Sequence, residues 1–231
     1  MPSSRCSESG KGTCCVIPAF NAAESVATVV LGLRRILPAA SITVIDDGSG
    51  DDTGGMAAAA GATVLRHERN RGKGAALRTG FAHAIADPQT ECILTLDADE
   101  QHRPEDAPDL IHRMDVSGAD IVIGSRRRAG SGMPIHRIVS NMITSFLVSA
   151  RTGQDIADSQ SGFRFIRRAV VEHTAFHHDG FEAETEFLLA ASQAGYRIDH
   201  VPVRTVYAGE RSHMTKWRTT VNFIRVLFQA P

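Results

Sequence analysis

The chain has 231 residues and a nearly balanced charge, with 25 Lys and Arg against 26 Asp and Glu. This length suits one sizeable α/β domain, and a formal net charge of -1 gives no general attraction to nucleic acid, so no nucleic-acid partner is expected. The four cysteines lack the paired spacing of a metal site, and three of them border or lie in apolar strands, which fits a reducing compartment. No apolar stretch has the length of a signal-peptide core or the roughly 20 residues of a bilayer-spanning helix, so we expect a cytoplasmic protein.

Residues 1–12 are small, polar and rich in Gly and Ser, and they predict a disordered tail. Beyond them, short apolar runs alternate with segments of helical spacing. This alternation predicts an α/β fold with a mostly parallel sheet flanked by helices. The expected strands are 14–17, 42–45, 63–65, 92–96, 119–124 and 201–207. The expected helices begin near residues 22, 53, 73, 104 and 135, and another runs through 188–194.

Polar clusters follow three of these strands, at 18–24, 46–52 and 97–102. In open α/β sheets, ligands bind beyond the carboxyl ends of the strands, so the clusters predict a nucleotide cleft at that edge. The segment 70–74, Asn-Arg-Gly-Lys-Gly, then opens a helix whose first N–H groups and lysine suit an anion. It lacks the spacing of a Walker loop or of a dinucleotide fingerprint, so a simple glycine turn at a helix start is the alternative.

The densest polar cluster follows the strand at 92–96. Asp97, Asp99 and Gln101 alternate along the chain, and in extended backbone they would face the same side. Two carboxylates and an amide oxygen suit Mg²⁺ or Mn²⁺. The spacing therefore predicts a divalent metal site, with a solvated acidic turn as the alternative.

Two helical segments in the second half of the chain are amphipathic. Apolar residues recur along 135–147, and we expect this stripe to pack in the core, with an interfacial membrane role as the alternative. Near the C-terminus, Trp217, Ile224 and Phe228 recur at helical spacing among basic residues. This terminal helix either docks onto the domain or contacts a membrane surface.

Taken in order, the motifs resemble the GT-A fold, family 2 inverting glycosyltransferases, and within them the polyprenyl-phosphate sugar transferases typified by dolichol-phosphate mannose synthase. The segments that carry the resemblance are 16–24, 46–53, 70–80, 96–106, 124–126, 158–164 and 184–186. The resemblance implies a GT-A catalytic domain over 13–210. It also implies a lid loop and a basic amphipathic helix in 211–231.

The resemblance implies three sets of site residues. A donor pocket would contain Pro18, Phe20, Asn21, Glu24, Asp46, Asp47, Lys73, Asp97 and Ala98. The metal on the donor diphosphate would be held by Asp97, Asp99 and Gln101. An acceptor phosphate would be bound by Arg126 and Arg137, with Ser140, Asn141, Arg164, Arg211 and Ser212 nearby. Two departures bear on the sugar and the lipid: Glu100 stands where an apolar or small residue is usual, and the lid lacks a Ser-Lys-Leu signature.

The predicted reaction is inverting transfer of a sugar from a nucleotide-diphosphate sugar, of the GDP-mannose or UDP-glucose type, to a polyprenyl or dolichyl phosphate. Asp97, Asp99, Arg126 and Glu184 are the candidate catalytic residues. A phosphate acceptor is already an anion, whereas a hydroxyl acceptor would need a base, for which Glu182 or Glu184 is the candidate. Such an acceptor implies peripheral contact with the cytoplasmic face of a membrane.

Three other functions are alternatives: a family 2 transferase acting on a saccharide or small-molecule hydroxyl, a nucleotide-sugar-binding module without turnover, and a nucleotidyltransferase. The nucleotidyltransferase would carry a glycine- and arginine-rich signature directly after the first strand, where Pro18, Ala19, Phe20 and Asn21 stand instead. The sequence leaves the oligomeric state open.

Overall fold

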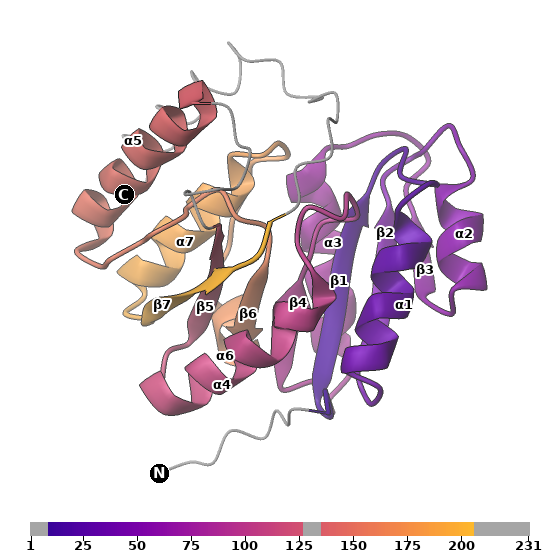
Figure 1. The fold of residues 1–231 in the computed structure, drawn as a ribbon, viewed down its shortest axis with the longest axis horizontal. Helices are drawn as coiled ribbons and strands as arrows, with labels where there is room; N and C mark the ends of the chain where they lie inside the picture. Colours follow the sequence, from indigo (N-terminus) through magenta and orange to yellow (C-terminus); the bar gives the residue numbers. More distant parts are fainter. Residues whose placement is uncertain (1–8, 127–134, 206–231) are drawn as a thin grey trace.

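The computed structural model describes residues 9–126 and 135–205, with only the backbone at 135–139. A sheet of seven strands runs through this part of the chain, in the order β3-β2-β1-β4-β6-β5-β7 (Figure 1). The strands are β1 (Thr13–Ala19), β2 (Ser41–Asp46), β3 (Thr63–Arg66), β4 (Cys92–Thr95), β5 (Ile121–Arg126), β6 (Arg164–Arg167) and β7 (Ile198–Val203). The helices are α1 (Val26–Ile36), α2 (Thr53–Ala59), α3 (Lys73–Ala86), the short 3₁₀ helix η1 (Pro104–Asp106), α4 (Ala107–Ser117), α5 (Ile135–Thr152), α6 (Arg168–His173) and α7 (Ala183–Gln193).

The strand pairing confirms the mostly parallel sheet. β1 pairs in parallel with β2 and β4, β2 with β3, and β5 with β7. Only β6 runs antiparallel, between β4 and β5. The sequence analysis did not predict β6, because its four residues begin and end with arginine and so lack the apolar pattern of a buried strand.

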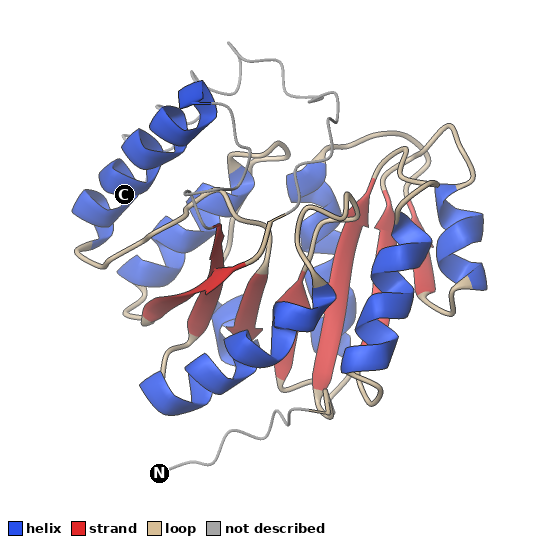
Figure 2. Ribbon diagram, viewed as in Figure 1, coloured by secondary structure: helices blue, strands red, loops and turns tan. Residues whose placement is uncertain are grey.

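Helices cover both faces of the sheet (Figures 1 and 2). Successive residues of a strand point to opposite faces, and accordingly Cys15 and Ile17 pack in one core while Cys14 and Val16 pack in the other. The first core also contains residues of α1, α2 and α4, and the second contains residues of α3, α6 and α7 and one residue of α5, Val148. Helix α5 lies outside α7, which it contacts.

In the part of α5 whose side chains the structure describes, the expected apolar stripe is not in the core. Met142, Ile143, Phe146 and Leu147 are exposed, whereas Asn141 and Ser145 are buried. Helical spacing shows which residues share a face, but not whether that face points inward.

Three further expectations concern the ends of the chain and its cysteines. Residues 9–12 are not a disordered tail, because the Ser9 carbonyl accepts the N–H of Ala39 and the Gly12 carbonyl accepts the N–H of Cys92. Cys14 and Cys15 are free and buried, whereas Cys92 is disulfide-bonded, which the sequence analysis did not predict. The expected lid loop and terminal helix at 211–231 lie outside the described residues.

Within 9–126 and 135–205, no helix is both long enough and apolar enough to cross a bilayer.

Candidate active site

The carboxyl ends of β1, β2, β4 and β5 meet at one edge of the sheet, as predicted. Hydrogen bonds join the loops after β1 and β2: the Asn21 N–H donates to Ser49 Oγ (2.9 Å), and Asn21 Oδ1 accepts the N–H of Gly50 (2.8 Å). Asn21 has a φ of +50°, a conformation that asparagine tolerates better than most residues. The two loops therefore form a fixed rim. Along this rim Phe20 is 40% exposed and Glu24 is exposed, while Pro18 is half-buried.

Asp46, the last residue of β2, and the next residue, Asp47, are both buried and have internal partners. Asp46 Oδ1 accepts the N–H of Ser49 (2.9 Å). Asp47 accepts the N–H groups of Arg71 (3.0 Å) and Gly72 (2.8 Å), and it lies 2.6 Å from His67 Nδ1. Asp47 therefore shapes the loop that leads into α3. Its contact with a nucleoside stays a prediction. The sequence analysis missed His67, because an isolated histidine in a polar segment carries no recognisable signal.

Lys73, Asp97 and Glu184 meet at the centre of the edge. Lys73 Nζ lies 2.7 Å from Asp97 Oδ1 and 3.1 Å from Glu184 Oε2, and the lysine side chain is only 13% exposed. Burial alone would lower the pKa of Lys73, but the two carboxylates raise it above its usual value. Burial would likewise raise the pKa of Asp97, and Lys73 lowers it. Lys73 and Asp97 are therefore both charged at neutral pH, and the lysine contacts two carboxylates that are far apart in the sequence.

The glycines on either side of Lys73 allow this meeting. The loop before α7 approaches the start of α3 so closely that a Cβ on Gly74 would lie 2.3 Å from the carbonyl oxygen of His178. The Gly74 N–H donates to the Asp179 carbonyl (2.7 Å). The same loop brings Phe181 to Lys73, with 5.8 Å between the ammonium and the ring centroid. The glycine-rich segment thus serves loop packing as well as the helix start.

The predicted metal ligands lie in a turn rather than in extended backbone. β4 ends at Thr95, and Asp99 Oδ1 accepts the N–H of Gln101 (3.1 Å), with Glu100 at a φ of +58°. The expectation that alternation places Asp97, Asp99 and Gln101 on one side of a strand is therefore wrong, because the aspartate closes a local turn instead. No group of three His, Cys, Asp or Glu side chains that could hold a metal occurs within 9–126 and 135–205.

The segment 158–164 packs against this turn. Thr95 Oγ1 donates to the Gly162 carbonyl (2.7 Å), and a Cβ on Gly162 would lie 2.5 Å from Asp97 Oδ2. A side chain at position 162 would therefore displace the Asp97 carboxylate. His102 also lies here, with Nε2 3.5 Å from Ser161 Oγ, and burial lowers its pKa to about 4. His102 is therefore neutral at physiological pH.

Arg164, predicted near the acceptor, is buried at 3% exposure. Its guanidinium donates to the carbonyls of Ser159 (3.0 Å), Ser161 (2.8 Å) and Glu184 (2.9 Å). Burial lowers the pKa of Arg164. This geometry makes Arg164 a support that joins the 158–164 segment to α7.

Arg126 ends β5 and is held by a buried carboxylate. Its Nε and Nη2 donate to the two oxygens of Asp158 (2.7 and 2.9 Å), and Asn141 Nδ2 donates to the same carboxylate (3.1 Å). Burial alone would raise the pKa of Asp158, but Arg126 lowers it below its usual value. Arg126, Asp158 and Asn141 thus join β5, the 158–164 segment and α5. Ser140 is exposed on α5, while the Arg137 side chain, Arg211 and Ser212 lie outside the described residues.

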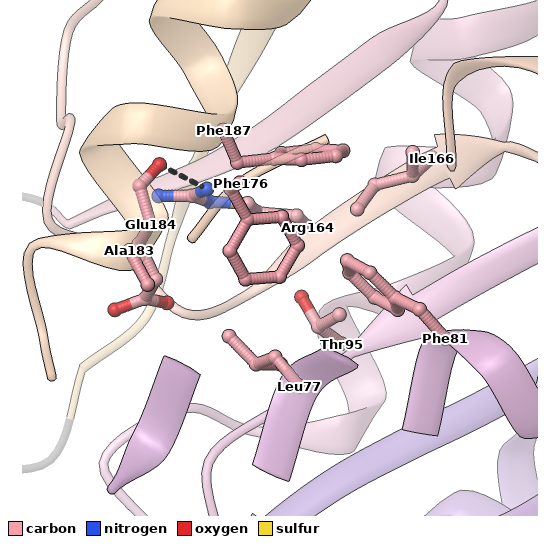
Figure 3. A pocket seen from close by; sticks show the side chains of 9 residues that line it. All are labelled: Leu77, Phe81, Thr95, Arg164, Ile166, Phe176, Ala183, Glu184 and Phe187. Atoms are coloured by element: carbon pink, nitrogen blue, oxygen red, sulfur yellow. Dashed lines mark hydrogen bonds between the residues drawn. The ribbon is translucent and has the colours of Figure 1, made fainter. Parts of the chain in front are cut away.

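Glu184 and Arg164 are among the residues that line a small hollow (Figure 3). Phe81, Phe176 and Phe187 form one wall. Its volume is about 10 Å³, which is about the space that one water needs. Figure 3 shows the Glu184 carboxylate pointing away from the aromatic rings. The hollow is therefore too small for a nucleotide.

Fold and site together define a GT-A glycosyltransferase: a mostly parallel sheet with acidic and basic side chains gathered beyond its carboxyl edge. The chain belongs to glycosyl transferase family 2, whose sequence profile matches residues 14–174.

Curated relatives agree with this assignment. Over 202 residues the chain is 29% identical to undecaprenyl-phosphate mannosyltransferase of Micrococcus luteus, covering 83% of this chain and 82% of the relative. Over 214 residues it is 27% identical to UDP-N-acetylglucosamine–dolichyl-phosphate N-acetylglucosaminyltransferase of Methanococcus voltae, covering 83% and 84%.

In fold the chain resembles glucosyl-3-phosphoglycerate synthase from Mycobacterium tuberculosis, with a TM-score of 0.77, 20% sequence identity and coverage of 96% of this chain and 79% of that chain. That crystal structure contains Mn²⁺, uridine diphosphate and phosphoglyceric acid.

Proposed function

We propose that the chain transfers a sugar, with inversion, from a nucleotide-diphosphate sugar to a polyprenyl or dolichyl phosphate at the cytoplasmic face of a membrane. The observation that carries this proposal is the pairing of Glu184 with Lys73, 3.1 Å apart. Glu184 was the candidate base for a hydroxyl acceptor, but its carboxylate holds an ammonium ion. A phosphate acceptor is an anion at neutral pH and needs no such base. The two relatives above are also named for lipid phosphates.

Asp97, Asp99 and Gln101 are the proposed ligands of Mg²⁺ or Mn²⁺. Their oxygens are the hard donors that these ions prefer, and Asp97 already attracts the ammonium of Lys73. When bound, the metal would neutralise charge on the donor diphosphate. The proposed role of Lys73 is to hold Asp97 and Glu184 in place and to present a positive charge beside the leaving diphosphate.

The donor pocket lies at the rim formed by the loops after β1 and β2. Phe20 offers an exposed ring to the base, and Asn21 and Glu24 offer polar groups beside it. The buried hydrogen bonds of Asp46 and Asp47 fix the backbone loops that would form the floor of this pocket. Pro18 and Ala98 complete the proposed donor contacts.

The acceptor phosphate is proposed to bind at Arg126. Asp158 fixes the guanidinium in one orientation, and a planar guanidinium can bind a phosphate through two parallel hydrogen bonds. A phosphate oxygen held in line with the anomeric carbon forms the new C–O bond as the bond to the nucleoside diphosphate breaks. Ser140 and Asn141 flank this position, and Arg137, Arg211 and Ser212 remain proposed contacts.

A radiolabelled transfer screen tests this proposal. The full chain is incubated with Mn²⁺ or Mg²⁺, a panel of UDP- and GDP-sugars, and either a polyprenyl phosphate or soluble saccharide acceptors. We expect label in the lipid-phosphate fraction with at least one donor, and none when EDTA is added. Label only in a soluble acceptor would instead support the hydroxyl transferase, and nucleotide-sugar binding without turnover would support a binding module.

A further inference from the structure

Helix α5 departs from the polarity of an ordinary surface helix. Over 140–150 its buried face is mostly polar, with Asn141 and Ser145 at 3% exposure and Thr144 at 9%, beside one apolar residue, Val148 at 0%. Its outward face carries large apolar residues, with exposures of 47% at Met142, 55% at Ile143, 71% at Phe146 and 39% at Leu147. We call these four residues the α5 apolar face.

The polar inward side of α5 has a structural reason. Asn141 Nδ2 donates to Asp158 (3.1 Å), and Ser145 Oγ accepts the N–H of Ser159 (3.1 Å). These contacts fix the 158–164 segment, whose Asp158 binds the Arg126 side chain. They explain the buried polar groups, but they do not explain why the outward side is apolar. The segment 140–150 contains no charged residue at all, whereas solvent-facing helix surfaces normally carry charged or polar groups.

We propose that the α5 apolar face lies in the interfacial region of a lipid bilayer while the enzyme acts. This inference rests on the proposed function, because an acceptor with a lipid tail resides in a bilayer and its phosphate must reach Arg126. Asp158 contacts both Arg126 and α5. The face that meets the bilayer is therefore on the helix that also orders the proposed phosphate site.

The size of the face favours a bilayer over a second copy of the chain. Its four side chains expose on the order of 400 Å², about half of the roughly 800 Å² that each partner buries in a standard stable protein interface. Interfacial helices bind membranes through such small apolar surfaces, because each inserted side chain contributes separately.

Flotation with neutral phosphatidylcholine vesicles tests the surface. Neutral lipid is chosen because a charge-free face needs no anionic lipid, whereas the basic residues of 211–231 would. The variants are Phe146→Glu and Ile143→Glu in the full chain. Val116→Glu is the matched control, since Val116 is 63% exposed and lies on α4. We expect each α5 variant to lower the ratio of bound to free protein at least about tenfold, and the control to leave it unchanged.

The proposed membrane contact would be overturned by no flotation of the unmodified chain, or by equal flotation of the unmodified chain and Phe146→Glu. A loss of thermal stability in lipid-free buffer that is much larger for Phe146→Glu than for Val116→Glu would also overturn it, because protein would then cover the face. Transfer activity separates the two proposals. If the α5 variants lose flotation as expected but no lipid phosphate accepts sugar from any donor, the proposed function fails while the surface stands.

Discussion

Replacing Asp158 by asparagine should strongly destabilise the protein. The substitution removes the charge that accepts two hydrogen bonds from the Arg126 side chain, which is only 15% exposed. Removing one partner of a buried ion pair leaves the other charge without compensation and costs about 3–5 kcal/mol of unfolding free energy. For a chain of this size, each kcal/mol lowers Tm by about 2–4 °C, so we expect a fall of about 6–20 °C.

The matched control is Asp199→Asn. Asp199 makes the same two-bond contact with Arg113 (2.8 and 3.1 Å), but this arginine side chain is 46% exposed. Exposed pairs contribute up to about 1 kcal/mol. Urea unfolding and thermal melts followed by circular dichroism measure both variants. If Asp158→Asn loses no more unfolding free energy than Asp199→Asn, the reasoning that burial makes the Asp158–Arg126 ion pair important for stability is refuted.

Four further predictions follow from the site. Because Arg126 lowers the pKa of Asp158 in the folded state, the ion pair stabilises the protein fully above the ordinary pKa of 3.8 and less as the pH falls below it; the difference in urea stability between the unmodified chain and Asp158→Asn should therefore shrink with acidification, and a constant difference would contradict this. Asp99→Ala should abolish transfer and metal-dependent binding of the nucleoside diphosphate, measured by calorimetry, with the thermal melt unchanged; turnover that survives this substitution would count against the metal site. Arg126→Lys should weaken transfer to a polyprenyl phosphate by about 1–3 kcal/mol, because lysine cannot make the two-bond contact, while donor binding stays the same; an equal loss of donor binding would place Arg126 in the donor site. Salt-sensitive binding to anionic vesicles should fall by about 1 kcal/mol for each basic residue replaced by alanine among Lys216, Arg218 and Arg225, and binding unaffected by these changes would exclude that contact.

The sequence was sufficient to predict the sheet and the edge at which the site lies. Apolar runs identified six of the strands, and acidic clusters at 46–52 and 97–102 follow two of them directly. Parallel strands bring their carboxyl ends together, so the position of a cluster along the chain already gave its position in the fold. The spacing of glycines and aspartates in these segments also indicated the family.

The contacts within the site were not predictable from the pattern. Lys73, Asp97 and Glu184 meet only because α3, β4 and α7 pack together, and no local feature of the sequence encodes that meeting. The turn at Asp99 replaced an expected extended segment because an aspartate can bond its own backbone two residues onward. The exposed face of α5 was read as core for a related reason, since periodicity does not fix the direction of a helix face.

The most direct test of the proposed reaction compares a polyprenyl phosphate with the corresponding polyprenol, which has the same tail and a hydroxyl in place of the phosphate. Each is incubated with the full chain, Mn²⁺ and the radiolabelled nucleotide sugar that gives turnover in the donor panel. We expect labelled product from the polyprenyl phosphate alone, and Glu184→Gln should retain it. Product from the polyprenol, lost on substitution of Glu184, would show that the acceptor is a hydroxyl and would contradict the account.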